Sequence, residues 1–204
     1  MARQKEFDRA EVLENAMRAF WRRGYEATSV QDLVEATGIN RGSMYDTFGD
    51  KRGLFQAAVQ HYITNVSAER LKVVAETDDA LAGIRTYFDR LIDFSVGDGR
   101  ELGCLITNSV VELAPHDEVI GETLRKSFAR VEDTFYRALL RAQQAGDLTT
   151  GQDIRALARF LTATVNGVRV FARADADATT LRDVIDSALS VIDTHKRGFP
   201  AAAE

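Results

Sequence analysis

The stretch that decides the fold runs over residues 28–48 and reads TSVQDLVEATGINRGSMYDTF. Its first apolar residues recur at helical spacing and follow a hydroxyl residue that can cap a helix, either Thr28 or Ser29. Gly38 ends this helix, because glycine adopts a positive φ at little cost. Asn40 can then cap a second short helix. The stretch therefore predicts two short helices joined by a tight turn.

The second of these helices has an inward and an outward side. Its inward side carries Ile39, Met44 and Phe48. Its outward side is polar. A helix-turn-helix protein places such a helix in the DNA major groove, where side chains near its N-terminus reach the base edges. The alternative is that both helices belong to the core of an ordinary all-α protein, since a turn with glycine between two helices is common.

A family resemblance favours DNA binding. Residues 8 to 62 carry a dense set of positions at the spacing found in the tetracycline-repressor (TetR) family of transcriptional regulators, and the chain resembles that family. The positions are Thr28-Ser29-Val30, Leu33, Ala36, Gly38-Ile39, Arg41-Gly42-Ser43, Tyr45, Phe48, Lys51 and Leu54-Phe55. Beyond about residue 65 the chain resembles the family in its layout only.

The resemblance implies two kinds of contact with DNA. Phosphate contacts would come from Thr28, Ser29, Tyr45 and Lys51. Base-edge contacts would come from Asn40, Arg41, Ser43 and Thr47, with Gly42 allowing close approach of the backbone. The residue types suit these roles. Arginine pairs with guanine, asparagine pairs with adenine, and hydroxyls can bond to either base or to a phosphate. Tyr45 as a core aromatic residue and Arg41 as a solvated cation remain the alternatives.

Composition describes an ordinary globular chain. The 204 residues are 45% apolar, contain two prolines, and show neither a signal peptide nor an apolar run long enough to span a membrane. The single cysteine excludes an internal disulfide and predicts a cytoplasmic location. The net charge of −5 argues mildly against nucleic acid, but residues 1–52 carry equal numbers of basic and acidic residues. The three histidines have no metal-ligand spacing, so no metal or cofactor is predicted.

Apolar periodicity predicts an all-α fold of about nine helices. We expect a three-helix, helix-turn-helix DNA-binding domain over residues 1–50 and a helical regulatory and dimerisation domain over residues 51–204. Residues 103–113 contain β-branched side chains and could form a strand. A buried helix is preferred there, because the segments on either side are helical.

The last two predicted helices are candidates for dimerisation. A palindromic operator requires two-fold symmetry in the protein that binds it. The resemblance implies that these helices pair with their twins as a four-helix bundle. The candidate residues are Leu161, Val165, Val168, Val184, Ala188 and Ile192. The alternative is that these helices only close the core of one protomer.

The middle helices would house a small-molecule effector. Buried ligand sites have apolar walls with a few polar groups that orient the guest. The candidates are Tyr62, Tyr87, Phe88, Ile106, Asn108, Glu112 and Phe128, each of which could instead be plain core. Cys104 could sense oxidants or electrophiles, or be an inert buried thiol.

These inferences describe a homodimeric transcriptional regulator, in particular a repressor, that binds a palindromic double-stranded operator and releases it when a small molecule binds. An alternative is a dedicated DNA-binding regulator or activator without a ligand. An enzyme is not predicted, because the chain lacks a phosphate loop, a nucleophile elbow and a metal set.

Overall fold

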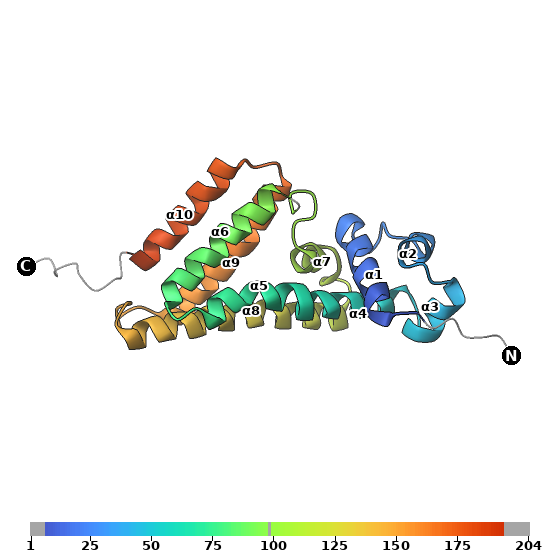
Figure 1. The fold of residues 1–204 in the computed structure, drawn as a ribbon, viewed down its shortest axis with the longest axis horizontal. Coiled ribbons are helices and arrows are strands. Elements are labelled where there is room, and N and C mark those ends of the chain that lie inside the picture. Colours follow the sequence, from blue (N-terminus) through green and yellow to red (C-terminus); the bar gives the residue numbers. More distant parts are fainter. Residues whose placement is uncertain (1–6, 98, 194–204) are drawn as a thin grey trace, which may run out of the picture. The chain divides into compact units, whose positions relative to one another are not determined.

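The computed structural model describes residues 7–97 and 99–193, and these residues form helices without any strand. The prediction of an all-α fold is therefore confirmed (Figure 1). The helices are α1 (Arg9–Arg23), α2 (Val30–Thr37), α3 (Arg41–Phe48), α4 (Lys51–His61), a π-helical segment (Tyr62–Ser67), α5 (Ala68–Glu76), α6 (Ala80–Val96), α7 (Leu105–Leu113), α8 (Glu118–Ala145), α9 (Ile154–Arg173) and α10 (Ala178–Asp193). Within the described ranges, no helix is both long and apolar enough to cross a membrane.

The chain forms two compact units. The first unit contains the described residues up to Glu69 together with Cys104–Leu124, so that α7 belongs with the N-terminal helices. The second unit contains Arg70–Gly103 and the described residues from Arg125 onward. The domain boundary at residue 50 stays a prediction, and the compact units divide at other positions.

Local signals explain the N-terminal helices of the first unit. Asp8 caps α1 by accepting the backbone N–H groups of Ala10 and Glu11. Ser29 caps α2, and Gly38 ends that helix with a φ of 70° in the left-handed region. These boundaries agree with the helix-turn-helix predicted from residues 28–48.

Aromatic contacts hold the first unit together. α1 packs against both α2 and α4. The ring of Phe20 lies edge-on to Phe55 with 5.0 Å between the ring centroids, and Trp21 contacts Tyr62 in the same way at 4.9 Å. Edge-to-face pairs add stabilisation of roughly 0.5–1.5 kcal/mol beyond that of area burial. These pairs pack α1 against α4 and against the π-helical segment.

Residues 103–113, for which the sequence allowed a strand or a helix, contain helix α7. Leu105–Leu113 is helical and mostly buried, as preferred from the sequence. Cys104 occupies the N-cap position and is buried. Its Sγ lies 3.6 Å from the hydroxyl of Tyr62. The β-branched residues of this segment therefore contribute to packing and do not change its helical conformation.

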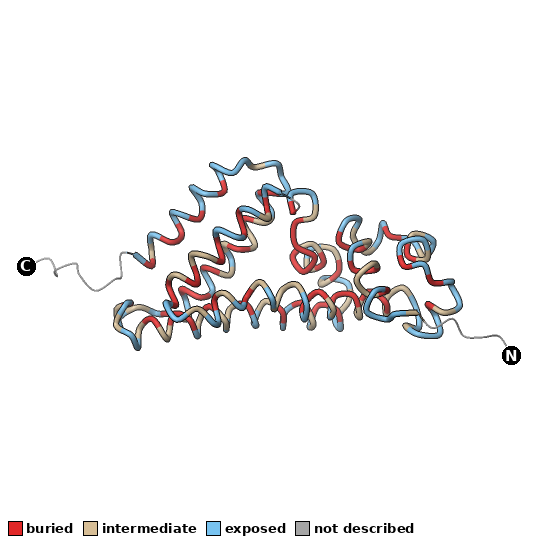
Figure 2. Tube along the Cα trace, in the orientation of Figure 1, coloured by how far each residue is buried: buried red, intermediate tan, exposed pale blue. Residues whose placement is uncertain are grey.

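The second unit is built around α6, α9 and α10, which lie side by side (Figure 1). Buried and exposed residues alternate along each helix with helical periodicity (Figure 2). Tyr87, Phe88 and Phe135 form an aromatic group in the core, with Tyr87 edge-on to both phenylalanines. The charged Arg169 of α9 reaches this group and donates to the Tyr87 hydroxyl at 3.4 Å.

Candidate nucleic-acid interface

α3 is anchored by its apolar side, which leaves its polar side outward. Met44 is fully buried, and Ile39, just before the helix, is also in the core. Asn40 caps the helix, because its Oδ1 accepts the backbone N–H of Ser43 at 2.8 Å. The start of α3, where a recognition helix contacts bases, is therefore fixed by two independent features, a cap and a buried anchor.

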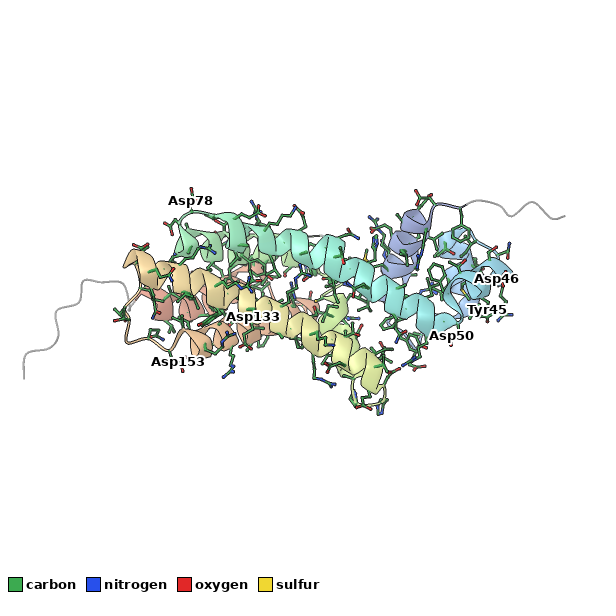
Figure 3. The ribbon with its side chains drawn as sticks, turned by 90° about the horizontal axis from the view of Figure 1, so that it is seen from below. Tyr45, Asp46, Asp50, Asp78, Asp133 and Asp153 are labelled. Carbon is green, nitrogen blue, oxygen red and sulfur yellow. The ribbon has the colours of Figure 1, made fainter. Side chains whose placement is uncertain are left out.

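Most of the predicted DNA-contacting residues on and before α3 are open to solvent. Tyr45 is 39% exposed, and Ser43 is half-buried. Asn40, Arg41, Gly42 and Thr47 are also exposed. The Arg41 guanidinium lies 5.9 Å from the centre of the Tyr45 ring, which places the two predicted DNA contacts beside each other. Asp46, labelled with Tyr45 at the edge of the first unit in Figure 3, adds a carboxylate to this helix that the sequence analysis did not consider.

A capping box fixes the start of α2. The Ser29 hydroxyl accepts the backbone N–H of Asp32 at 3.1 Å, and the Asp32 carboxylate accepts the backbone N–H of Ser29 at 2.8 Å. The Ser29 hydroxyl also donates to Asp32 Oδ2, and Arg23 donates to Oδ1. The bonds from Ser29, followed by that from Arg23, lower the pKa of Asp32 to about 2. Ser29 thus remains exposed while its hydroxyl is oriented by the helix it caps.

Thr28 requires a correction. The sequence analysis assigned it a phosphate contact, but its relative exposure is 0% and its hydroxyl donates to the carbonyl of Gly24 at 2.6 Å. Its backbone N–H also donates to the carbonyl of Tyr25. A buried hydroxyl with a short bond to the protein is not presented to a phosphate. The residue instead closes the turn between α1 and α2.

Lys51 lies at the start of α4 and is tied to that same turn. Its ammonium lies 4.3 Å from the centre of the Tyr25 ring, and it approaches the carbonyl of Glu26 at 3.4 Å. Asp50 caps α4 by accepting the N–H of Gly53 at 2.7 Å. The lysine is half-buried, so its stem is held while its charge stays near the surface.

Glu112 has a role that the sequence analysis did not find. It was a candidate for ligand binding, but its carboxylate accepts the backbone N–H groups of Tyr25 at 3.0 Å and of Glu26 at 2.8 Å. Gly24 makes room for it, since a Cβ at that position would lie 3.0 Å from a Glu112 oxygen. No local sequence signal could have revealed this contact, because the partners lie 86 and 87 positions away along the chain.

The ligand candidates fall into both compact units. Tyr62, Ile106, Asn108 and Glu112 belong to the first unit, and Tyr87, Phe88 and Phe128 belong to the second. Within the second unit, Tyr87 and Phe88 are in ring contact. Within the first, Tyr62 lies beside Cys104. Two surface hollows, of about 510 and 650 Å³, are lined by other residues than these seven candidates. An effector site at the candidates therefore stays a prediction.

The dimerisation candidates are mostly turned inward. Val184 is partly exposed, but the other five residues are buried within their own protomer, namely Leu161, Val165, Val168, Ala188 and Ile192. The most regular apolar stripe of each helix is the stripe that faces the protomer's core. The outward apolar residues of α9 are Phe160, Val170 and Phe171, each 44–53% exposed.

α3 is a short capped helix with a buried anchor and a polar outer face, and it follows a second short helix that ends at a left-handed glycine. This arrangement defines a helix-turn-helix protein of the DNA-binding class. Two family profiles match the chain. "Bacterial regulatory proteins, tetR family" covers residues 12–58, and "Tetracyclin repressor-like, C-terminal domain" covers residues 80–188. The chain belongs to the TetR family of transcriptional regulators.

Relatives and solved structures agree with this assignment. The chain is 40% identical to the uncharacterized HTH-type transcriptional regulator YezE of Bacillus subtilis over 95% of this chain and 100% of that protein. It is 32% identical to the transcriptional repressor ComR of Escherichia coli, covering 92% of this chain and 90% of ComR. A cysteine mutant of the TetR-family regulator CifR, solved with a 26-bp double-strand operator, superposes with a TM-score of 0.82 at 29% identity, covering 94% of this chain and 100% of that one.

Proposed function

We propose that this protein is a homodimeric repressor that binds a palindromic DNA operator through α3 and releases it when a small molecule binds the helical C-terminal part. The observation that carries the DNA-binding part is the geometry of α3, whose apolar side is buried at Met44 while Asn40, Arg41 and Thr47 face solvent. The operator complex of CifR supports the same conclusion by similarity. The cytoplasm, where an operator is accessible, is the location this function requires.

Within this proposal, Arg41 and Asn40 read base edges, and Lys51 contacts a phosphate. Arginine presents a planar fork to guanine, and Asn40 offers its side-chain NH2 as a donor while its Oδ1 caps α3. Ser43 and Thr47 supply hydroxyls to base edges, and Ser29 and Tyr45 supply hydroxyls to DNA phosphates. We remove Thr28 from this set, because its hydroxyl is bonded inside the protein.

The dimer surface we propose lies on the outer face of α9. Phe160 and Phe171 are exposed along it at helical spacing, with Thr164 and Gly167 between them, and the exposed Val170 precedes Phe171 on the solvent side of the helix. Exposed apolar side chains that gather into a patch mark an interaction surface. A Cβ on Gly167 would meet no atom within 4 Å, so this part of the helix is open for the close approach of a second helix. The proposed dimer surface also includes the exposed Val184 on the neighbouring helix, α10.

The proposed effector is a small molecule with an aromatic or extended apolar part. The aromatic residues Tyr87, Phe88 and Phe135 of the second unit are suitable walls for such a ligand. Release of DNA requires the effector to bind the DNA-free conformation more tightly, and a tenfold loss of DNA affinity needs a difference of about 1.4 kcal/mol. A regulator without an effector is the alternative that a ligand screen separates from this one.

Selection of bound duplexes from a random DNA pool tests the proposal most directly. We expect enrichment of an inverted repeat whose half-sites lie about one helical turn apart or a multiple of it. Recovery of no preferred sequence at low salt would reject operator binding. A thermal-shift screen of small molecules, followed by gel shifts with the selected duplex, then tests the effector. A ligand that raises the melting temperature and weakens DNA binding is the expected result.

A further inference from the structure

We propose that Glu112 of α7 is a positioning residue for DNA binding, because its carboxylate holds the turn between α1 and α2 from which Lys51 takes its position. This inference rests on the proposed operator binding. Glu112 lies on α7, outside the helix-turn-helix, and is not itself expected to touch DNA. Its effect would pass through the backbone of Tyr25 and Glu26.

The first step is the bond between Glu112 and the turn. One carboxylate oxygen accepts the N–H of Tyr25 at 3.0 Å, and the other accepts the N–H of Glu26 at 2.8 Å. A carboxylate that accepts two backbone N–H groups makes charge-assisted bonds, which are roughly twice as strong as neutral ones. Glu112 is half-buried, so water competes for these bonds less than it would at an open surface.

The turn itself is shaped to receive the carboxylate. Gly24 has a φ of 84°, a conformation that favours glycine, and it ends α1 as the C-cap. A Cβ there would lie 3.0 and 3.2 Å from the two Glu112 oxygens. The glycine therefore satisfies two conditions at once, namely the left-handed backbone and the space that the Glu112 carboxylate occupies.

The second step is the contact of the turn with Lys51 and with the residues that precede α2. Lys51 is held by the Glu26 carbonyl at 3.4 Å and by the face of the Tyr25 ring at 4.3 Å. Both partners belong to the two residues whose N–H groups Glu112 accepts. Thr28, which precedes the Ser29 cap of α2, is bonded to Gly24 and Tyr25. Release of Glu112 would therefore loosen Lys51 and the start of α2 together.

The consequence is a specific route for regulation. α7 follows the buried Cys104 and lies in the same compact unit as the helix-turn-helix. A displacement of α7 that separates Glu112 from the turn would weaken the phosphate contact of Lys51 while leaving α3 and its base-reading residues intact. The expected signature is a loss of affinity for all DNA sequences alike with little change in sequence preference.

The test compares Glu112→Gln with Glu14→Gln. Glutamine keeps the size of Glu112 but has a single acceptor oxygen, so at least one of the two N–H bonds is lost. Glu14 is a matched control in the first unit, because its carboxylate accepts from Arg18 and His61 and not from the turn. The readouts are the amide exchange rates of Tyr25 and Glu26, the melting temperature, and the affinity for the duplex selected by the wild-type protein over a range of salt concentrations.

We expect Glu112→Gln to speed amide exchange at Tyr25 and Glu26 at least tenfold. We also expect it to weaken operator binding about tenfold and to reduce the slope of log affinity against log salt by about one, because one phosphate contact is lost. Glu14→Gln should change neither the slope nor these two exchange rates. Gly24→Ala, which pushes a Cβ toward the carboxylate, should reproduce the loss of operator affinity.

Three outcomes would overturn the inference. An unchanged salt slope and operator affinity in Glu112→Gln would show that the turn does not position Lys51. An equal loss in Glu14→Gln would show a general effect of stability. Unchanged amide exchange at Tyr25 and Glu26 would show that the bonds do not hold the turn. If the wild-type protein binds no duplex, the proposed function fails instead, and amide exchange still reports on the bonds of Glu112.

Discussion

Asp117 and Arg52 form a bidentate ion pair, with 2.6 Å between Asp117 Oδ2 and Arg52 Nε and 2.9 Å between Asp117 Oδ1 and Arg52 Nη2. Arg52 belongs to the first turn of α4, next to Lys51. Asp117 lies just before α8 and also accepts the N–H of Ile120 at 3.0 Å. Glu112 makes one attachment of residues 104–124 to the N-terminal part of the first unit, and this ion pair makes a second.

The Asp117–Arg52 pair predicts a pH-dependent contribution to stability. The hydrogen bonds from Arg52, followed by that from Ile120, lower the pKa of Asp117 to about 2. A carboxyl group whose pKa is lowered by folding contributes stability above its unfolded pKa of about 3.9, and this contribution is lost as the pH falls toward the folded value. Asp117→Asn should therefore lower the free energy of unfolding near neutral pH, and the difference from wild type should shrink between about pH 4 and pH 2.

Denaturant unfolding at several pH values measures this effect. Asp183→Asn, at an exposed position of α10, is the control and should leave the curve unchanged. A difference between Asp117→Asn and wild type that stays constant down to about pH 2 would contradict the assignment of the shift to this carboxyl group.

The capping box of α2 predicts a stability loss for Ser29→Ala. The substitution removes the acceptor for the Asp32 N–H and the hydroxyl that donates to the Asp32 carboxylate. Loss of an N-cap serine costs about 1 kcal/mol of unfolding free energy. The urea midpoint should fall without a change in the slope of the transition, because the surface exposed on unfolding is unchanged. Ser187→Ala, inside α10, should stay near wild type, and an equal fall there would argue against capping as the cause.

Arg41 and Lys51 should differ in how they affect DNA binding. Arg41→Ala should relax sequence preference at one base position and cost about 1–3 kcal/mol on the selected duplex. Lys51→Ala should weaken all duplexes by a similar factor and reduce the salt slope by about one. Fluorescence anisotropy with the selected duplex and a scrambled duplex separates the two effects. Equal losses on both duplexes for Arg41→Ala would remove the base-reading role from that residue.

A charged side chain on the outer face of α9 should weaken the proposed dimer. Val170 is 53% exposed on α9, and Val170→Asp would place a carboxylate in the proposed dimer surface. Sedimentation should show a shift from dimer to monomer at micromolar concentration. Val119→Asp is a matched control, because Val119 is 58% exposed but belongs to the first unit. If both variants stay dimeric, the surface on α9 is not the contact.

Much of the fold could be predicted because its signals are local. The caps at Asp8, Ser29 and Asn40 each bond to an N–H two or three residues ahead, so residue type and spacing were sufficient to find them. Helical periodicity likewise identified α6 and α8 through α10. The DNA-contacting residues came from the family resemblance and stay a prediction, and the burial of Thr28 depends on how the turn between α1 and α2 folds back.

The errors have a common physical cause. An apolar stripe in the sequence marks a face that is buried, but it does not say whether the protomer's own core or a second copy covers it. Val165 and Val168 therefore looked suited to dimerisation and are core residues, whereas Phe160 and Val170 face outward. Glu112 was a candidate for orienting a ligand because a buried carboxylate needs polar partners, and the partners it has are backbone groups distant in the sequence.

The sequence by itself determined that this chain is helical, that it carries a helix-turn-helix near its N-terminus, and that α3 presents a polar face. These properties follow from caps, glycines and periodicity, which act over a few residues. Only the tertiary structure decided that Glu112 and Asp117 bind the N-terminal helices and that Thr28 is enclosed. The contacts of Glu112 and Asp117 join residues that are close in space and far apart along the chain, and no local pattern records which distant group a carboxylate will meet.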